Sequence, residues 1–204
     1  MQVEKLTQNS EAIKLAIFAS GRGSNFVAIM NRARDGQLEG LEPALLITDK
    51  DCPSLQSAKE FDLPHAYIRP KDYADKAAYE QAILDLLHKH QVQLIALAGY
   101  MRLVGPTLLE AYPDRILNLH PSLLPAYPGT ESIRRAYEDN LKESGVTVHL
   151  VDAGLDSGPI LAQAKVAIEE DMCLDEFEEA IHKKEHQLYP DTLIDYAKKL
   201  WSQS

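Results

Sequence analysis

The sequence predicts an α/β protein with a doubly wound, mostly parallel central sheet, an antiparallel C-terminal portion and helices on both faces. Short apolar segments alternate with helix-like segments along much of the chain, which is typical of a parallel sheet. Two of these apolar segments, residues 13–19 and 92–98, are almost uninterrupted, as expected for strands covered on both faces. Near the C-terminus, residues 146–151 and 160–168 are joined by a short loop, which favours an antiparallel pair.

The helices and strands can be predicted in order from the apolar patterns and from the residues that interrupt them. We expect strands at residues 13–19, 44–48, 65–69, 92–98, 115–120, 146–151 and 160–168. We expect helices at residues 26–34, 53–61, 73–88, 131–140 and 174–201, with a break in the last at Pro190, because proline lacks the N–H that a helix interior needs. We expect residues 1–11 to form a loose N-terminal extension. With no linker and no internal repeat, the 204 residues predict a single domain, 1–204.

The composition is that of a globular protein with an excess of acidic residues. There are 31 Asp and Glu residues against 21 Lys and Arg residues, a net charge of -10, which argues against nucleic-acid and anionic membrane partners. No apolar run approaches the roughly 20 residues of a membrane-spanning helix, and the N-terminal residues are too polar for a signal peptide. The two cysteines, Cys52 and Cys173, form no CxxC motif. We therefore expect a cytoplasmic protein with small-molecule partners, and a homodimer stays open.

The most informative stretch is the strand that ends at His120. Side chains alternate along a strand, so Asn118 and His120 share one face, while Leu117 and Leu119 point into the core. Pro121 cannot continue the sheet ladder, so the strand should stop at His120. A carboxamide and an imidazole then lie side by side at the carboxyl end of a strand, where open α/β sheets bind ligands.

A glycine-rich loop follows the first strand and leads into a helix. Backbone N–H groups and the helix dipole converge on an anion in this layout, and Ser24 or Asn25 is a candidate N-cap. The dinucleotide fingerprint fails because Phe26 stands where its third glycine is needed, although Asp49 resembles its ribose-binding acid. A phosphomonoester site on Gly23, Ser24 and Asn25 and a plain strand-to-helix turn both stay open.

Two further segments each allow two interpretations. Residues 99–104 follow a strand end, and their aromatic, Met and Leu side chains suit a pocket for a flat ring or an ordinary helix start. The sequence His182-Lys183-Lys184-Glu185-His186 matches a zinc-protease pattern. A zinc site needs at least a third protein ligand, and the residues after His186 offer no clear candidate, which favours a surface helix.

These motifs together resemble the formyltransferase family that uses formyl-tetrahydrofolate. The resemblance rests on Asn118, His120 and the Pro-Ser-Leu-Leu-Pro that follows, and on Gly-Leu-Asp-Ser-Gly-Pro-Ile at residues 154–160. It covers residues 14–190. The Gly-x-Gly-Ser-Asn loop and the Leu-Ala-Gly-Tyr-Met-Arg segment resemble the members that formylate phosphoribosylglycinamide in purine biosynthesis.

The resemblance implies a role for each matching residue. It implies catalytic roles for Asn118, His120 and Asp156, phosphate binding by Gly23, Ser24 and Asn25, and contact with the glycinamide substrate by Glu185. It implies folate binding by Met101, Arg102, Leu103, Val104, Asp152 and Lys76, although Lys76 stands where some members have arginine. The implied co-substrate is formyl-tetrahydrofolate, and no metal is implied.

The residue types fit a formyl transfer by direct amine attack. Asn118 can donate to the oxygen of the tetrahedral intermediate, a contact typically contributing about 100- to 1000-fold in rate. His120 can donate a proton as an imidazolium, and a nearby carboxylate such as Asp156 favours that charged form. A hydrolase that uses water with the same residues, and a folate- or phosphate-binding module without activity, remain the alternatives.

Overall fold

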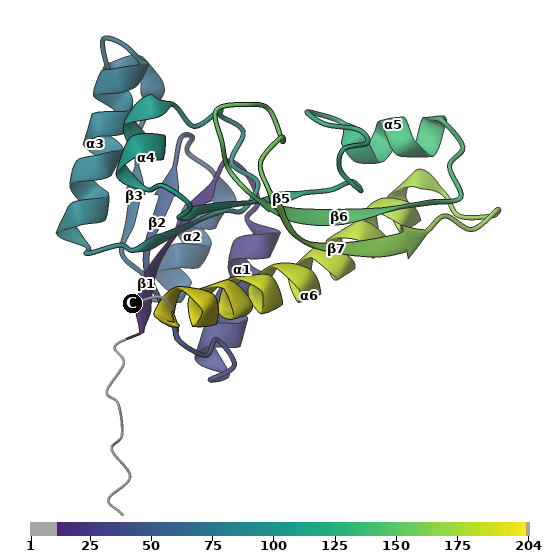
Figure 1. Ribbon diagram of the computed structural model, residues 1–204, viewed down its shortest axis with the longest axis horizontal. Coiled ribbons are helices and arrows are strands. Elements are labelled where there is room, and N and C mark those ends of the chain that lie inside the picture. The colour runs from purple at the N-terminus through teal and green to yellow at the C-terminus, as the bar shows by residue number, and fades with distance from the viewer. Residues whose placement is uncertain (1–11, 203–204) are drawn as a thin grey trace, which may run out of the picture.

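The computed structural model describes residues 12–202, and its centre is a seven-stranded sheet (Figure 1). The strand order is β3-β2-β1-β4-β5-β6-β7. The strands are β1 (Ile13–Ala19), β2 (Leu41–Thr48), β3 (His65–Tyr67), β4 (Leu94–Leu97), β5 (Ile116–His120), β6 (Glu143–Leu150) and β7 (Ile160–Ala167). All neighbours from β3 to β5 pair in parallel, and β5–β6 and β6–β7 pair antiparallel. The predicted fold class is confirmed.

Helices cover both faces of this sheet, as Figure 1 shows. Those with apolar side chains in one core are α1 (Ser24–Arg34), α2 (Pro53–Glu60) and α6 (Leu174–Trp201). Those in the other core are α3 (Lys76–Lys89) and α4 (Pro106–Ala111). A short α5 (Ser132–Glu138) packs against α6, and a 3-10 turn, η1 (Pro70–Asp72), precedes α3.

The two cores lie on opposite faces of the same strands. In β1, Leu15 and Ile17 belong to the core beneath α1 and α6, whereas Ala16 and Phe18 belong to the core beneath α3. All four are completely buried. Alternation across a strand that is covered on both sides explains why the sequence is apolar at every position here.

The topology fixes where a ligand site can form. From β1 the chain adds β2 and β3 on one side, then crosses to add β4 and β5 on the other. The loops at the carboxyl ends of β1 and β4 therefore diverge, and such a switch point leaves a crevice for ligands. The glycine loop after β1, the segment after β4 and His120 at the end of β5 all belong to this edge.

The predicted break at Pro190 is wrong, because α6 continues through this residue. Pro190 is buried, and it follows Tyr189, a fully buried side chain whose hydroxyl donates to the carbonyls of Leu97 and Leu117. Both halves of the helix pack into the core beneath the sheet, with Phe177 on one side and Leu193 on the other. This packing offsets the roughly 3 kcal/mol that an interior proline costs a helix.

The N-terminal cap of α1 also differs from the prediction. Gly23, with φ 74°, is the N-cap, and neither Ser24 nor Asn25 caps the helix with its side chain. A side chain at Gly23 would be strained, and its Cβ would lie 2.7 Å from the Cβ of Ser54. Helix α4 was not predicted from the sequence, and the expected N-terminal extension, residues 1–11, lies outside the described residues.

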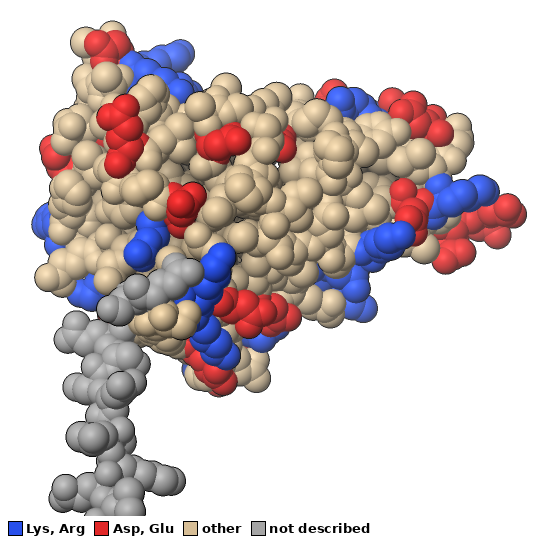
Figure 2. Space-filling model, in the orientation of Figure 1, with Lys and Arg blue, Asp and Glu red and all other residues tan. Residues whose placement is uncertain are grey.

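The surface carries both signs of charge. Figure 2 shows acidic and basic side chains interspersed over one face of the molecule. The net charge of -10 is therefore not gathered into one acidic area on that face. Among residues 12–202, no helix has the length and apolar character that crossing a membrane requires.

Gly145 gives a test of how tightly β6 and β7 pack. A Cβ at this position would collide with the carbonyl oxygen of Ala164 and lie 2.7 Å from a methyl group of Leu123. We expect Gly145→Ala to lower the free energy of unfolding by about 1–3 kcal/mol, measured by chemical denaturation. Gly21→Ala is the control, because its Cβ would meet nothing within 4 Å and its φ is not left-handed. A loss at Gly145 no larger than at Gly21 would contradict this packing.

Candidate active site

The site is built around the carboxylate of Asp156, at the tip of the loop between β6 and β7. Its Oδ2 lies 3.4 Å from Nδ1 of His120 and accepts a 2.8 Å hydrogen bond from the N–H of Gly129. Its Oδ1 accepts a hydrogen bond from Nδ2 of Asn118 at 3.3 Å. The structure therefore brings the three predicted catalytic side chains together, and only a tenth of the Asp156 side chain is exposed.

The ring of His120 faces an acceptor at each nitrogen. Nδ1 faces the carboxylate of Asp156, and Nε2 lies 2.9 Å from the carbonyl oxygen of Tyr127. A carbonyl oxygen and a carboxylate only accept hydrogen bonds, so the doubly protonated ring satisfies both contacts. Tyr127 itself has a φ of 54°, a left-handed conformation that presents its carbonyl to His120.

The surroundings of Asp156 stabilise its charged form. They lower the pKa of this carboxyl group to about 2. The contact with the ring of His149 is the largest cause, the N–H of Gly129 and the charge of His120 act in the same direction, and burial opposes them. Asp156 is therefore an anion at neutral pH, and it can hold a cationic His120 in place.

His149 is a member of this cluster that the sequence analysis did not assign. It lies directly opposite Asn118 in the β5–β6 pairing, as Thr147 lies opposite His120. Its Nδ1 lies 2.8 Å from the carbonyl oxygen of Leu150, and its Nε2 lies 3.1 Å from Nδ2 of Asn118 and 3.6 Å from Oδ1 of Asp156. A neutral ring accepts the amide proton of Asn118, and a charged ring attracts the carboxylate.

The signal for His149 was the alternating pattern of β6, which places it on one face with Thr147. The pattern alone does not give the pairing register. Only the observed register places this face of β6 beside Asn118 and His120.

The glycine loop meets α6 through two of the predicted residues. Oε2 of Glu185 accepts a hydrogen bond from Nδ2 of Asn25 at 2.9 Å and lies 3.0 Å from Nδ1 of His182. Glu185 is only 4% exposed, so this contact orients a nearly buried carboxylate beside the N-terminus of α1. The same carboxylate raises the pKa of His182. Oδ1 of Asn25, the atom that a cap would use, has no hydrogen-bond partner among residues 12–202, and Gly23 takes the N-cap position instead.

The segment after β4 presents apolar side chains to solvent. Met101 is 69% exposed and Leu103 is 63% exposed, so two large apolar side chains of this segment face solvent. Lys76, at the start of α3, lies close to Gly105: a Cβ added to this glycine would be 2.7 Å from Cε of Lys76. Lys76 therefore lies beside Gly105, which directly follows the predicted folate residues 101–104, and its Nζ lies 3.9 Å from Oε1 of Glu80.

Asp152 shapes the loop that carries Asp156. Its Oδ1 accepts hydrogen bonds from the N–H of Gly154 at 2.9 Å and from the hydroxyl of Ser157 at 2.8 Å. The two bonds tie the residues on either side of Asp156 back to Asp152, and Asp156 itself has a left-handed φ of 50°. Asp152 is itself exposed at the surface of this loop.

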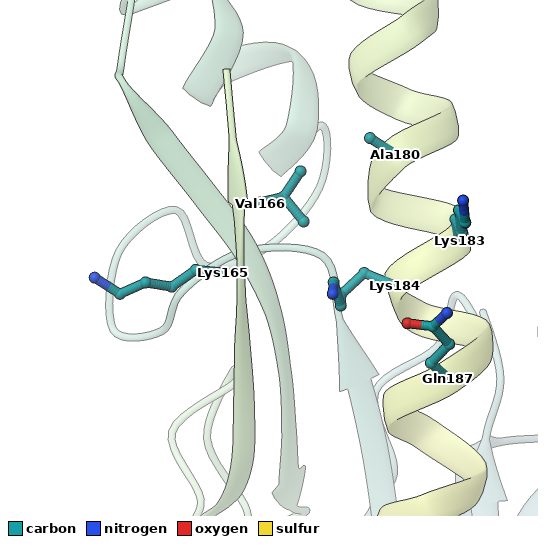
Figure 3. A pocket seen from close by; sticks show the side chains of 6 residues that line it. All are labelled: Lys165, Val166, Ala180, Lys183, Lys184 and Gln187. Atoms are coloured by element: carbon teal, nitrogen blue, oxygen red, sulfur yellow. The ribbon is translucent and has the colours of Figure 1, made fainter. Parts of the chain in front are cut away.

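A shallow depression of about 380 Å³ lies elsewhere, between β7 and α6 (Figure 3). Its lining includes Lys165, Lys183 and Lys184, and it contains none of the predicted site residues. Within the described part of the chain, no three His, Cys, Asp or Glu side chains are grouped so that they could hold a metal ion. His182 and Glu185 of the zinc-like motif pair with each other instead.

The comparison with known families agrees with this geometry. Residues 13–193 match the formyl transferase family, a span that includes every predicted site residue. The chain therefore belongs to the formyl transferase family and is an enzyme.

Within this family, the chain is similar to phosphoribosylglycinamide formyltransferases. It is 48% identical to that of Bacillus subtilis over 181 residues, which cover 88% of this chain and 92% of the relative. It is 30% identical to that of Escherichia coli, covering 87% of this chain and 84% of the relative. The crystal structure of the Bacillus halodurans protein of the same name superposes with a TM-score of 0.88 at 48% identity, covering 92% and 96% of the two chains.

The lowered pKa of Asp156 predicts that the free energy of unfolding depends on pH in the acidic range. Its pKa is about 2 in the folded chain and about 3.9 in an unfolded chain. The ionised carboxylate therefore stabilises the fold by up to about 2 kcal/mol above about pH 4, and this contribution is lost as the pH falls towards about 2.

Asp156→Asn lacks this contribution at every pH. The difference in free energy of unfolding between the wild type and Asp156→Asn should therefore shrink between about pH 4 and about pH 2 in a series of denaturant titrations. Asp51→Asn, at an exposed position, serves as the control. A difference for Asp156→Asn that stays constant over this range would show that the carboxylate has no lowered pKa.

Proposed function

We propose that this enzyme transfers the formyl group of formyl-tetrahydrofolate to the amine of phosphoribosylglycinamide, in purine biosynthesis. One observation carries the proposal: Asp156 lies 3.4 Å from His120 and accepts a hydrogen bond from Asn118, so the three side chains form one cluster at the carboxyl end of β5. The names of the similar proteins from Bacillus and Escherichia support the choice of substrate. A cytoplasmic location and small-molecule partners remain part of the proposal.

The acceptor substrate is assigned to the glycine loop and α6. The first N–H groups of α1 have no partner within the helix, and the helix dipole adds positive potential there, which suits a phosphate dianion. Gly23, Ser24 and Asn25 supply this end of the helix. Glu185, held by Asn25, offers a carboxylate to the amine-bearing end of the same substrate.

The folate co-substrate is assigned to the segment after β4 and to the β6–β7 loop. The exposed side chains of Met101 and Leu103 offer apolar surface for a flat ring, and the nearby Lys76 offers a positive charge for a carboxylate tail. Arg102 and Val104 belong to the same segment, and the loop that begins at Asp152 carries Asp156 towards the ring. The formyl group then lies near the catalytic cluster.

The chemical step follows from the groups in that cluster. The substrate amine attacks the formyl carbon, a C–N bond forms, and the carbonyl oxygen becomes an oxyanion. Asn118 and His120 carry N–H groups that stabilise this oxygen, and the folate nitrogen leaves with a proton as its bond to carbon breaks. The proton given up by the attacking amine balances the proton taken by the leaving nitrogen.

Both donors change partner during this step. Nε2 of His120 contacts the carbonyl of Tyr127, a neutral acceptor, and an oxyanion at the same place is a stronger one. Nδ1 of His120 keeps its contact with Asp156, which holds the charged ring in position. Nδ2 of Asn118 is shared by Asp156 and His149, so one of its two protons turns to the oxyanion.

The first experiment measures loss of formyl-tetrahydrofolate by absorbance, with and without phosphoribosylglycinamide. We expect turnover only when the phosphorylated amine is present, because the glycine loop and Glu185 are assigned to that substrate. Equal turnover without the amine would identify a hydrolase and make the glycine loop a structural turn. No turnover under either condition would contradict the proposed reaction and favour a folate- or phosphate-binding module without activity.

The second prediction concerns the catalytic cluster. His120→Ala and Asp156→Asn should each slow turnover by about 100- to 10,000-fold, the contribution typical of a positioned general acid. The circular dichroism spectrum should stay that of the wild type. His88→Ala, on the exposed side of α3, is the matched control and should keep normal turnover. Near-normal turnover of both cluster variants would contradict the mechanism.

A further inference from the structure

A buried carboxylate outside the catalytic cluster lies at the same edge of the sheet. Asp49 follows β2 and is 5% exposed. Its Oδ1 accepts a hydrogen bond of 2.5 Å from the hydroxyl of Ser20, the residue that follows β1 and is 7% exposed. Asp49 is therefore a nearly buried partner of Ser20, whereas the ribose-binding acid of a dinucleotide site has to face its ligand.

The hydroxyl of Ser20 connects this carboxylate to the segment after β4. It accepts a 2.9 Å hydrogen bond from the backbone N–H of Met101. A serine hydroxyl has one proton, and a carboxylate can only accept, so the proton of Ser20 points to Asp49. That orientation turns a lone pair of the oxygen towards Met101. The backbone N–H of Ser20 adds a 3.1 Å bond to the carbonyl of Gly99.

The other side of this segment is held by aromatic contacts. The hydroxyls of Tyr79 and Tyr100 lie 2.7 Å apart, and the ring of Tyr100 meets that of Phe18 edge-on at 5.3 Å. The guanidinium of Arg102 lies 5.6 Å from the ring centre of Tyr79. Burial raises the pKa of Tyr100, and the bond to Tyr79 and the negative charge of Asp49 act in the same direction. The backbone of this segment is thus tied to β1 and α3, while the side chains of Met101 and Leu103 stay exposed.

We propose that Asp49 and Ser20 are positioning residues for folate binding: through the chain Asp49–Ser20–Met101 they fix the backbone from which the folate-binding side chains project. The inference rests on the proposed function, because it takes residues 101–104 as the folate-binding segment. Neither side chain touches the reacting atoms. Their effect should therefore fall on the affinity for formyl-tetrahydrofolate and leave the chemical step and the amine substrate almost unchanged.

The test compares steady-state kinetics of the full chain and two variants. We expect Ser20→Ala to raise KM for formyl-tetrahydrofolate about tenfold, the factor that the loss of one hydrogen bond typically produces. KM for phosphoribosylglycinamide and kcat should stay within about twofold. Asp49→Asn keeps the shape and an acceptor oxygen but loses the charge, so a smaller increase of about threefold is expected. Ser144→Ala, another buried serine, is the control.

A second readout separates this inference from the proposed function. Hydrogen exchange of the Met101 amide should be slow in the wild type and at least about tenfold faster in Ser20→Ala, whatever the reaction catalysed. Wild-type protein without turnover would overturn the proposed function alone. Unchanged amide exchange, or KM values for both substrates that rise together in Ser20→Ala and Asp49→Asn, would overturn the positioning role. If Ser20→Ala fails to fold, the KM values of Asp49→Asn decide alone.

Discussion

The carboxylate of Asp156 is the interaction on which the site depends. It collects contacts from three separate parts of the chain: His120 at the end of β5, His149 in β6, and the N–H of Gly129 in the loop before α5. Without an anion there, two imidazole rings and an amide would lack a common partner in a nearly buried space. The same carboxylate holds the loop that contains Gly129, and the carbonyl of Tyr127 in this loop contacts Nε2 of His120. Asp156 therefore contacts the catalytic histidine and also positions the loop beside it.

The sheet provides the precision of this arrangement. Because β5 and β6 are antiparallel, Asn118 pairs directly with His149, and His120 pairs with Thr147. A slip of one residue in this register would turn both catalytic side chains to the opposite face. At the neighbouring switch point, the hydroxyl of Ser20 links β1 to the segment after β4, and the glycine loop leads into α1. The catalytic side chains and Ser20 thus lie in or directly after strands, which hold side chains more precisely than loops alone would.

Much of this was predictable because the decisive signals are local. Alternation and Pro121 fixed the face and the end of β5, and the apolar runs indicated the parallel strands. The errors came from long-range packing. Pro190 stays helical because buried side chains hold α6 on both sides of it, and Asn25 pairs with Glu185, 160 positions away in the chain. The role of His149 depends on a pairing register that no pattern in one strand reveals, and the single-domain assignment stays a prediction.

The most direct test of this account is whether Asp156 and His120 act as one unit, measured as kcat/KM in a double-mutant cycle of Asp156→Asn and His120→Ala. Because Oδ2 of Asp156 lies 3.4 Å from Nδ1 of His120, we predict that Asp156→Asn slows turnover much less in the His120→Ala background than in the wild type. An equal fold loss in both backgrounds would contradict the claim that Asp156 acts on catalysis through His120.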